Sequence, residues 1–200
     1  MSKNTALTFL NCFNNKLTTL DVSVNNALTY LSCLTNKLTS LDVTNNTALI
    51  NLLCGSNQLK TIDISKNTAL TIFSSENNQL TTLDVTKNTA LIEFYCYKNQ
   101  LSYLNLSKNS ALTFLRSYGN VITTICINPK HITTDWDTDP NMIYTTTCRI
   151  ITGIDETTTE MTKQLVRIVT PLGRVIKPEE AIEGVFIYQY SDGSTRKIAK

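Results

Sequence analysis

Residues 4–24 read NTALTFLNCFNNKLTTLDVSV, and five further segments repeat this pattern without a change in length. The alanine of the pattern shows the spacing, because it recurs every 21 residues at Ala6, Ala27, Ala48, Ala69, Ala90 and Ala111. An unbroken period of this length is typical of one supersecondary unit stacked on copies of itself. The sequence therefore predicts a solenoid in which each repeat position forms a column of side chains along the stack.

The apolar positions of the repeat predict the core and the strands. In the first unit they are Leu7, Leu10, Cys12, Leu17, Leu20 and Val22. The alternation in Leu10-Asn11-Cys12 has the period of a β-strand, so successive units should pair in parallel about 4.8 Å apart. The return half of each unit is too short and too rich in Thr and Val for a helix, and we expect it to be extended or 3₁₀. The predicted fold is a mainly β solenoid.

One asparagine holds the same position in all six units and should be structural. The column consists of Asn15, Asn36, Asn57, Asn78, Asn99 and Asn120. A buried amide is costly unless it is hydrogen-bonded. We therefore expect each side chain to bond backbone groups of its own turn and of adjacent turns.

The segment from Leu7 to Leu17 follows L-x-x-L-x-C-x-x-N-x-L, which resembles the leucine-rich-repeat signature. The resemblance implies a parallel sheet on a concave face and a role in binding rather than catalysis. The short period with its Leu-Asp-Val ending is similar to repeats of bacterial secreted or surface leucine-rich proteins.

The composition argues against several functions. The chain of 200 residues has a net charge of +2 and lacks the basic stripe that nucleic-acid binding requires. It has no run of 18 apolar residues, so we expect no membrane span. The single histidine, His131, has no Ser or Cys partner arranged around it, so we expect neither an enzyme nor a cofactor.

A column of aspartates has two interpretations. It comprises Asp21, Asp42, Asp63 and Asp84. Each carboxylate could accept hydrogen bonds from turn N–H groups, or the column could hold a row of calcium ions. Calcium takes six to eight oxygen ligands and each turn supplies one carboxylate, so hydrogen bonding is favoured and no metal site is expected.

The six cysteines fall into two classes. Cys12, Cys33, Cys54 and Cys96 occupy an inward slot, where neighbouring parallel strands give poor disulfide geometry, and should be buried free thiols. Cys126 and Cys148 lie outside that slot and flank a segment with the single Trp. We expect these two to form a disulfide that closes a cap loop, which fits an oxidising compartment.

The outward strand positions carry aromatic residues towards both ends of the stack. The candidate ligand-binding residues are Phe9, Phe13, Tyr30, Leu34, Glu93, Tyr95, Tyr97, Phe114, Arg116 and Tyr118. Exposed aromatic residues with arginine nearby are typical of recognition surfaces, so we expect a protein or glycan ligand. Alternatively, the rings only stabilise the sheet as neighbouring-strand pairs.

Beyond the repeats the sequence changes character. We predict repeats over 1–128, a cap loop over 129–148, a polar linker over 149–163 and a small antiparallel β region over 164–200. The repeat units start at Asn4, Asn25, Asn46, Asn67, Asn88 and Asn109. Val169-Thr-Pro-Leu-Gly-Arg174 and Gly184-Val-Phe-Ile-Tyr188, with a basic C-terminus, resemble part of a type IX secretion sorting domain. This resemblance implies export by that machinery to the cell surface or beyond.

The function predicted is a non-enzymatic, extracellular or outer-membrane surface binding module. The chain starts at Met1 without a signal peptide or a cap, so we expect it to be a fragment of a longer protein. If the tail resemblance is spurious, a cytoplasmic location follows. The alternative function is a structural spacer or array unit that self-associates through its uncapped N-terminal edge.

Overall fold

The computed structural model describes residues 4–133, 136–140 and 142–148, together with four strands between 165 and 199. The chain divides into two compact units. The first consists of Met1–Met142 and Thr146–Cys148, and the second of Ile143–Thr145 and Arg149–Lys200.

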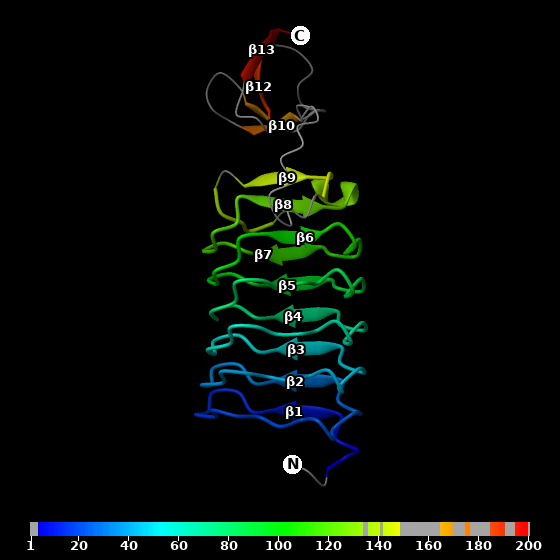
Figure 1. Ribbon diagram of the computed structural model, residues 1–200. Helices are drawn as coiled ribbons and strands as arrows, with labels where there is room; N and C mark the ends of the chain where they lie inside the picture. Colours follow the sequence, from blue (N-terminus) through cyan, green and yellow to red (C-terminus); the bar gives the residue numbers. More distant parts are fainter. Residues whose placement is uncertain are drawn as a thin grey trace, which may run out of the picture. The chain divides into compact units, whose positions relative to one another are not determined.

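The first unit is a solenoid built on a six-stranded parallel sheet (Figure 1). Each strand has three residues, and the strands are β1 (Phe9–Asn11), β2 (Tyr30–Ser32), β3 (Asn51–Leu53), β4 (Ile72–Ser74), β5 (Glu93–Tyr95) and β7 (Phe114–Arg116). Neighbours pair with an offset of one repeat, as in Leu10 with Leu31 and Phe73 with Phe94. The central residue of every strand from β2 onward is fully buried. The predicted parallel solenoid is therefore confirmed.

The return half of each turn contains no α-helix or 3₁₀ helix over residues 4–128. Near the end of the solenoid, β6 (Leu104–Leu106) pairs in parallel with β8 (Thr124–Ile127). A short 3₁₀ helix, η1 (Pro129–Thr133), follows the last turn. The return halves of the repeats therefore contain no 3₁₀ helix, and in the last turns they include the strands β6 and β8.

The asparagine column joins each turn to the one before it. The side-chain amide of Asn57 donates to the carbonyl oxygens of Cys33, Cys54 and Gly55 at 3.0–3.1 Å. Its Oδ1 accepts a hydrogen bond of 3.0 Å from the N–H of Leu38. The same pattern recurs at Asn36, Asn78 and Asn99. These amides complete the hydrogen bonding of buried backbone that the strands leave unpaired.

A second asparagine ladder, which the sequence analysis used only to mark repeat starts, lies on the other side of the core. Its members Asn25, Asn46, Asn67, Asn88 and Asn109 are fully buried. Asn67, for example, donates to the carbonyl oxygens of Val43 and Asn46 in the preceding turn, at 2.9 and 2.8 Å. The hydrogen bonds of the two ladders together link every interior turn to the preceding turn at two positions.

The cysteines occupy the places expected of them. Cys33, Cys54 and Cys96 are buried free thiols, and Cys12 is partly buried. Burial raises the pKa of the Cys33 thiol to about 12, so it is uncharged at neutral pH. Outside this column, Cys126 and Cys148 form a disulfide with a Cα–Cα distance of 5.4 Å. The predicted disulfide is therefore confirmed.

His131 ends the second asparagine ladder. Its side chain is only 4% exposed, and its Nε2 lies 2.8 Å from the carbonyl oxygen of Asn109. A carbonyl oxygen can only accept, so Nε2 carries the hydrogen. The Trp136 ring lies 4.9 Å from the imidazole and packs against the core. These two residues close the last turn.

We expect the solenoid to lose stability as pH falls below about 6.5, the pKa of an unperturbed histidine. Burial lowers the pKa of His131 below 6.5, so the unfolded chain takes up the proton more readily than the folded one. Stability is therefore present above the unfolded pKa and declines below it, down to the folded pKa. Urea unfolding at several pH values measures this change. Since His131 is the single histidine, His131→Gln should remove the dependence in this window, and an unchanged dependence would contradict the assignment.

The second unit contains β9 (Ile143–Thr145) and a four-stranded antiparallel sheet in the order β11-β10-β12-β13. The strands are β10 (Leu165–Val169), β11 (Val175–Ile176), β12 (Val185–Tyr190) and β13 (Thr195–Ala199). Within the β region expected over 164–200, the sequence predicts strands at 164–170, 184–190 and 195–199, which correspond to β10, β12 and β13, and it gives no signal for β11. The predicted linker over 149–163 lies outside the described residues.

Candidate functional site

Three columns of outward side chains make up one face of the parallel sheet, which we call the concave face. The first contains Phe9, Tyr30, Asn51, Ile72, Glu93 and Phe114, and the second contains Asn11, Ser32, Leu53, Ser74, Tyr95 and Arg116. The third, just beyond the strands, contains Phe13, Leu34, Gly55, Glu76, Tyr97 and Tyr118. Because the register never slips, neighbours within a column lie about 4.8 Å apart.

The predicted site residues form two separate groups on this face. In the first two turns, the Phe9 and Tyr30 rings stack with centroids 4.4 Å apart. Phe9 and Phe13 are 56% and 53% exposed. Leu34 is half-buried in the same column as Phe13. This first group is apolar and accessible.

The second group lies on the last two turns of the sheet. Tyr97 stacks on Tyr118 with centroids 4.8 Å apart, and Tyr95 meets Phe114 at 5.3 Å in a tilted arrangement. The guanidinium carbon of Arg116 lies 5.3 Å from the Phe114 ring centroid, within cation–π range. These five side chains form two ring pairs on the same two turns, with one cation beside Phe114.

Carboxylates border the second group. Tyr95 donates its hydroxyl hydrogen to Glu93 at 2.8 Å, and Arg116 pairs with Asp137 at 3.6 Å. Burial and the nearby Glu93 raise the pKa of Tyr95 above 10. The phenol therefore stays protonated and can act as a donor at neutral pH.

Glu76 lies between the two groups and was not among the predicted site residues. Its Oε2 accepts a hydrogen bond of 2.5 Å from the Ser74 hydroxyl. The carboxylate fills space that Gly55 leaves open, since a Cβ at position 55 would collide with Glu76 Oε1. The alternation pattern places Glu76 on the outward face, but nothing in the sequence signals its pairing with a glycine one turn away.

The aspartate column shows the hydrogen-bonded arrangement. Asp42 Oδ1 accepts from the hydroxyl and the N–H of Thr44 at 2.7 and 2.9 Å, and both bonds lower the pKa of the carboxyl. Asp21, Asp63 and Asp84 each accept from the N–H two residues later. Within the described part of the chain, no three His, Cys, Asp or Glu side chains are grouped to hold a metal ion.

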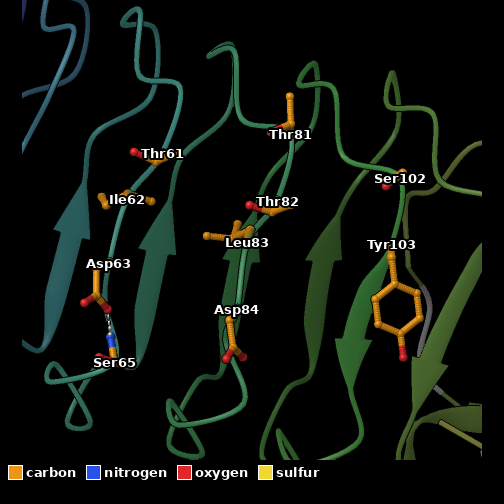
Figure 2. Close-up of a pocket in the computed structure, with 10 residues that line it drawn as sticks. All are labelled: Thr61, Ile62, Asp63, Ser65, Thr81, Thr82, Leu83, Asp84, Ser102 and Tyr103. Carbon is orange, nitrogen blue, oxygen red and sulfur yellow. Dashed lines mark hydrogen bonds between the residues drawn. The ribbon is translucent and has the colours of Figure 1, made fainter. Parts of the chain in front are cut away.

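A groove of about 360 Å³ lies on the return side of the solenoid (Figure 2). Its lining comprises Thr61, Ile62, Asp63, Ser65, Thr81, Thr82, Leu83, Asp84, Ser102 and Tyr103. Figure 2 shows Asp63 directed at Ser65 within its own turn rather than at Asp84. The carboxylates here are already hydrogen-bonded, so the concave face is the stronger candidate.

Comparisons with known proteins identify the repeat architecture. No family model matches the sequence, and no curated protein is significantly similar to it. Among solved structures, the functional domain of InlJ from Listeria monocytogenes, described as including a cysteine ladder, is 34% identical with a TM-score of 0.63. The leucine-rich-repeat protein LIC12759 of Leptospira interrogans is 20% identical with a TM-score of 0.59.

Both matches cover 70% of this chain, which spans 31% and 38% of those proteins. The chain thus covers about a third of the length of the structures it resembles. The neighbours are bacterial leucine-rich-repeat proteins, and the solenoid fits them. They give no support to the resemblance of residues 164–200 to a sorting domain. No helix in the described residues is long and apolar enough to cross a membrane.

Proposed function

We propose that this leucine-rich-repeat solenoid is a non-enzymatic module that binds a protein partner through its concave face. The observation that supports this proposal is the second aromatic group, in which Tyr95, Tyr97, Phe114 and Tyr118 lie side by side with Arg116. Tyrosine and arginine are the residue types enriched at binding hot spots. Their side chains occupy an outward face, whereas the core is filled by a different set of residues.

The first group adds a second contact area. Phe9 and Phe13 are more than half exposed and lie beside Tyr30 and Leu34, and contiguous exposed apolar side chains mark interaction sites. A ligand that reaches from this group to the second would extend across the whole sheet.

We also propose that the protein works outside the cytoplasm. The Cys126–Cys148 disulfide supports this location, because such bonds persist in oxidising compartments. The column formed by Cys12, Cys33, Cys54 and Cys96 parallels the cysteine ladder described for InlJ. Mass spectrometry of protein recovered from its host tests the location, and free thiols at Cys126 and Cys148 would contradict it.

The binding proposal is tested by selecting a phage-displayed random dodecapeptide library on the immobilised full chain. We expect the enriched peptides to bind the variant Y95A/Y97A/Y118A at least about 100-fold more weakly, since each hot-spot residue contributes more than 1 kcal/mol. The matched control is T18A/T39A/T81A, which changes three exposed residues outside the concave face.

Two results would overturn the proposal. One is a selection that enriches no peptide. The other is enrichment of peptides that bind the tyrosine variant as tightly as the wild type, particularly if that variant loses stability. The rings would then serve to stabilise neighbouring strands.

A further inference from the structure

We infer that the concave face is specific for a partner segment carrying a lysine or arginine, whose cationic head pairs with Glu76. The inference rests on the proposed function, because it specifies which ligand the concave face takes. It is drawn from the contacts of Glu76, from the rings beside it and from the distribution of charge along the face.

The Glu76 carboxylate is held in place, and no described residue supplies it with a cation. Its side chain is half-buried, and its one hydrogen bond comes from the Ser74 hydroxyl. Among the described residues, the ion pair formed is that of Arg116 with Asp137, which leaves Glu76 out. An ionised carboxylate shielded from water gains most from a charged partner.

Gly55 keeps the carboxylate in this position. With no Cβ, it leaves room for the Glu76 side chain to lie back over the preceding turn. A side chain at position 55 would push the carboxylate outward. The glycine and the serine together orient the acid before any ligand arrives, which reduces the ordering cost of binding.

Aromatic rings border the carboxylate on the other side. Glu76 and Tyr97 occupy the same column one turn apart, and the N–H of Asn77 bonds the carbonyl oxygen of Tyr97 at 3.0 Å. Tyr97 stacks in turn on Tyr118. Burial and the proximity of Glu76 raise the pKa of Tyr97, so its ring stays neutral. A carboxylate beside tyrosine faces suits an ammonium or guanidinium group, which both attract.

The distribution of charge along the concave face predicts the orientation of the bound segment. The outward columns of the first three turns contain no charged residue, as their members Phe9, Asn11, Phe13, Tyr30, Ser32, Leu34, Asn51, Leu53 and Gly55 show. The charged residues of the columns lie further on, and Arg116 is already paired with Asp137. Glu76 and Glu93 therefore give the second half of the face a negative balance.

Geometry sets the spacing of the ligand. Phe13 and Gly55 lie in one column two turns apart, and the Glu76 carboxylate lies beside Gly55, which gives a distance of about 10 Å at 4.8 Å per turn. An extended peptide covers that distance in about three residues at 3.4 Å each, and its side chains on one face recur every second residue. We therefore expect an apolar or aromatic residue about two or four positions from the basic residue.

The test uses the peptides selected on the wild-type full chain. We expect Lys or Arg at a fixed position in the enriched sequences, and binding of those peptides to Glu76→Gln to be at least about 10-fold weaker. Gly55→Ala keeps every charge but displaces the carboxylate, and should weaken binding in the same direction. Asp84→Asn, which removes an exposed carboxylate outside the concave face, should bind like the wild type. Thermal unfolding confirms that each variant is folded.

The outcomes separate the inference from the proposed function. Peptides that need the tyrosines but contain no basic residue, or that bind Glu76→Gln as tightly as the wild type, overturn the inference alone. Equal weakening by Glu76→Gln and Asp84→Asn also overturns it, because the effect would then be one of net charge. Peptides indifferent to the tyrosines overturn the proposed function and the inference together.

Discussion

Replacing Asn57 with alanine should lower the free energy of unfolding by about 3–5 kcal/mol, since each buried polar group left unsatisfied costs about 1–3 kcal/mol. The substitution leaves the Leu38 N–H without its acceptor in the interior of the stack. The carbonyl oxygens of Cys33, Cys54 and Gly55 each lose one hydrogen bond and keep another donor, at about 0.5–1.5 kcal/mol per lost bond. Water at the edges of the turn can replace only part of these bonds. Urea unfolding followed by circular dichroism measures the loss.

Asn15 is the matched control because it holds the same slot in the first turn. It is exposed, and its amide donates to Cys12 and Phe13 within its own turn. Asn15→Ala should therefore cost less than about 1 kcal/mol, the net value of an ordinary hydrogen bond. Similar losses of stability at the two positions would show that the hydrogen bonds of the interior ladder contribute no more stability than those of a surface turn.

Phe94→Ala should destabilise the solenoid by about 3–5 kcal/mol, the usual cost of truncating a core phenylalanine. Phe94 is fully buried, and its ring stacks on Phe73 with centroids 5.6 Å apart. Phe114→Ala is the control on the outward face, and should cost about 1 kcal/mol because cross-strand pairs contribute about 0.2–1 kcal/mol.

The effects of the two substitutions on peptide binding should have the opposite order to their effects on stability. Binding to Phe114→Ala should weaken, while Phe94→Ala, measured under conditions where it is folded, should bind like the wild type. The same unfolding and binding assays serve both variants. If Phe114→Ala proved as destabilising as Phe94→Ala without any loss of binding, the aromatic residues of the concave face would be structural.

Much of the scaffold follows from the sequence because the repeat multiplies each local signal. A single alternating segment such as Leu10-Asn-Cys12 is weak evidence for a strand, but six equivalent segments at one spacing fix strand, register and inward face together. The Cys126–Cys148 disulfide was also predictable, because both cysteines fall outside the slot that the other four occupy. The sequence places the candidate site residues in columns along the stack. Their division into two groups follows from which turns carry the aromatic residues.

The features that were missed depend on relations the sequence does not show. Thr35, Ser56 and Lys98 have positive φ values of 53–56°, a conformation that favours glycine, and Gly119 is the single glycine in that column. The repeat imposes this backbone conformation, so the preferences of the individual residues do not predict it. The role of Glu76 was hidden for a similar reason, since it depends on the empty space at Gly55 in another turn. Strand β11 has two residues, too few to produce a periodic pattern.

The unbroken register makes the whole turn the unit in which such a protein can change over generations. Each interior asparagine bonds the turn immediately before it, so duplicating one complete repeat gives every amide the same carbonyl partners as before. Deleting a single residue would instead leave one boundary with mismatched amides and an inverted strand face. Gene duplication can therefore lengthen the recognition surface in steps of about 4.8 Å while the core needs no redesign.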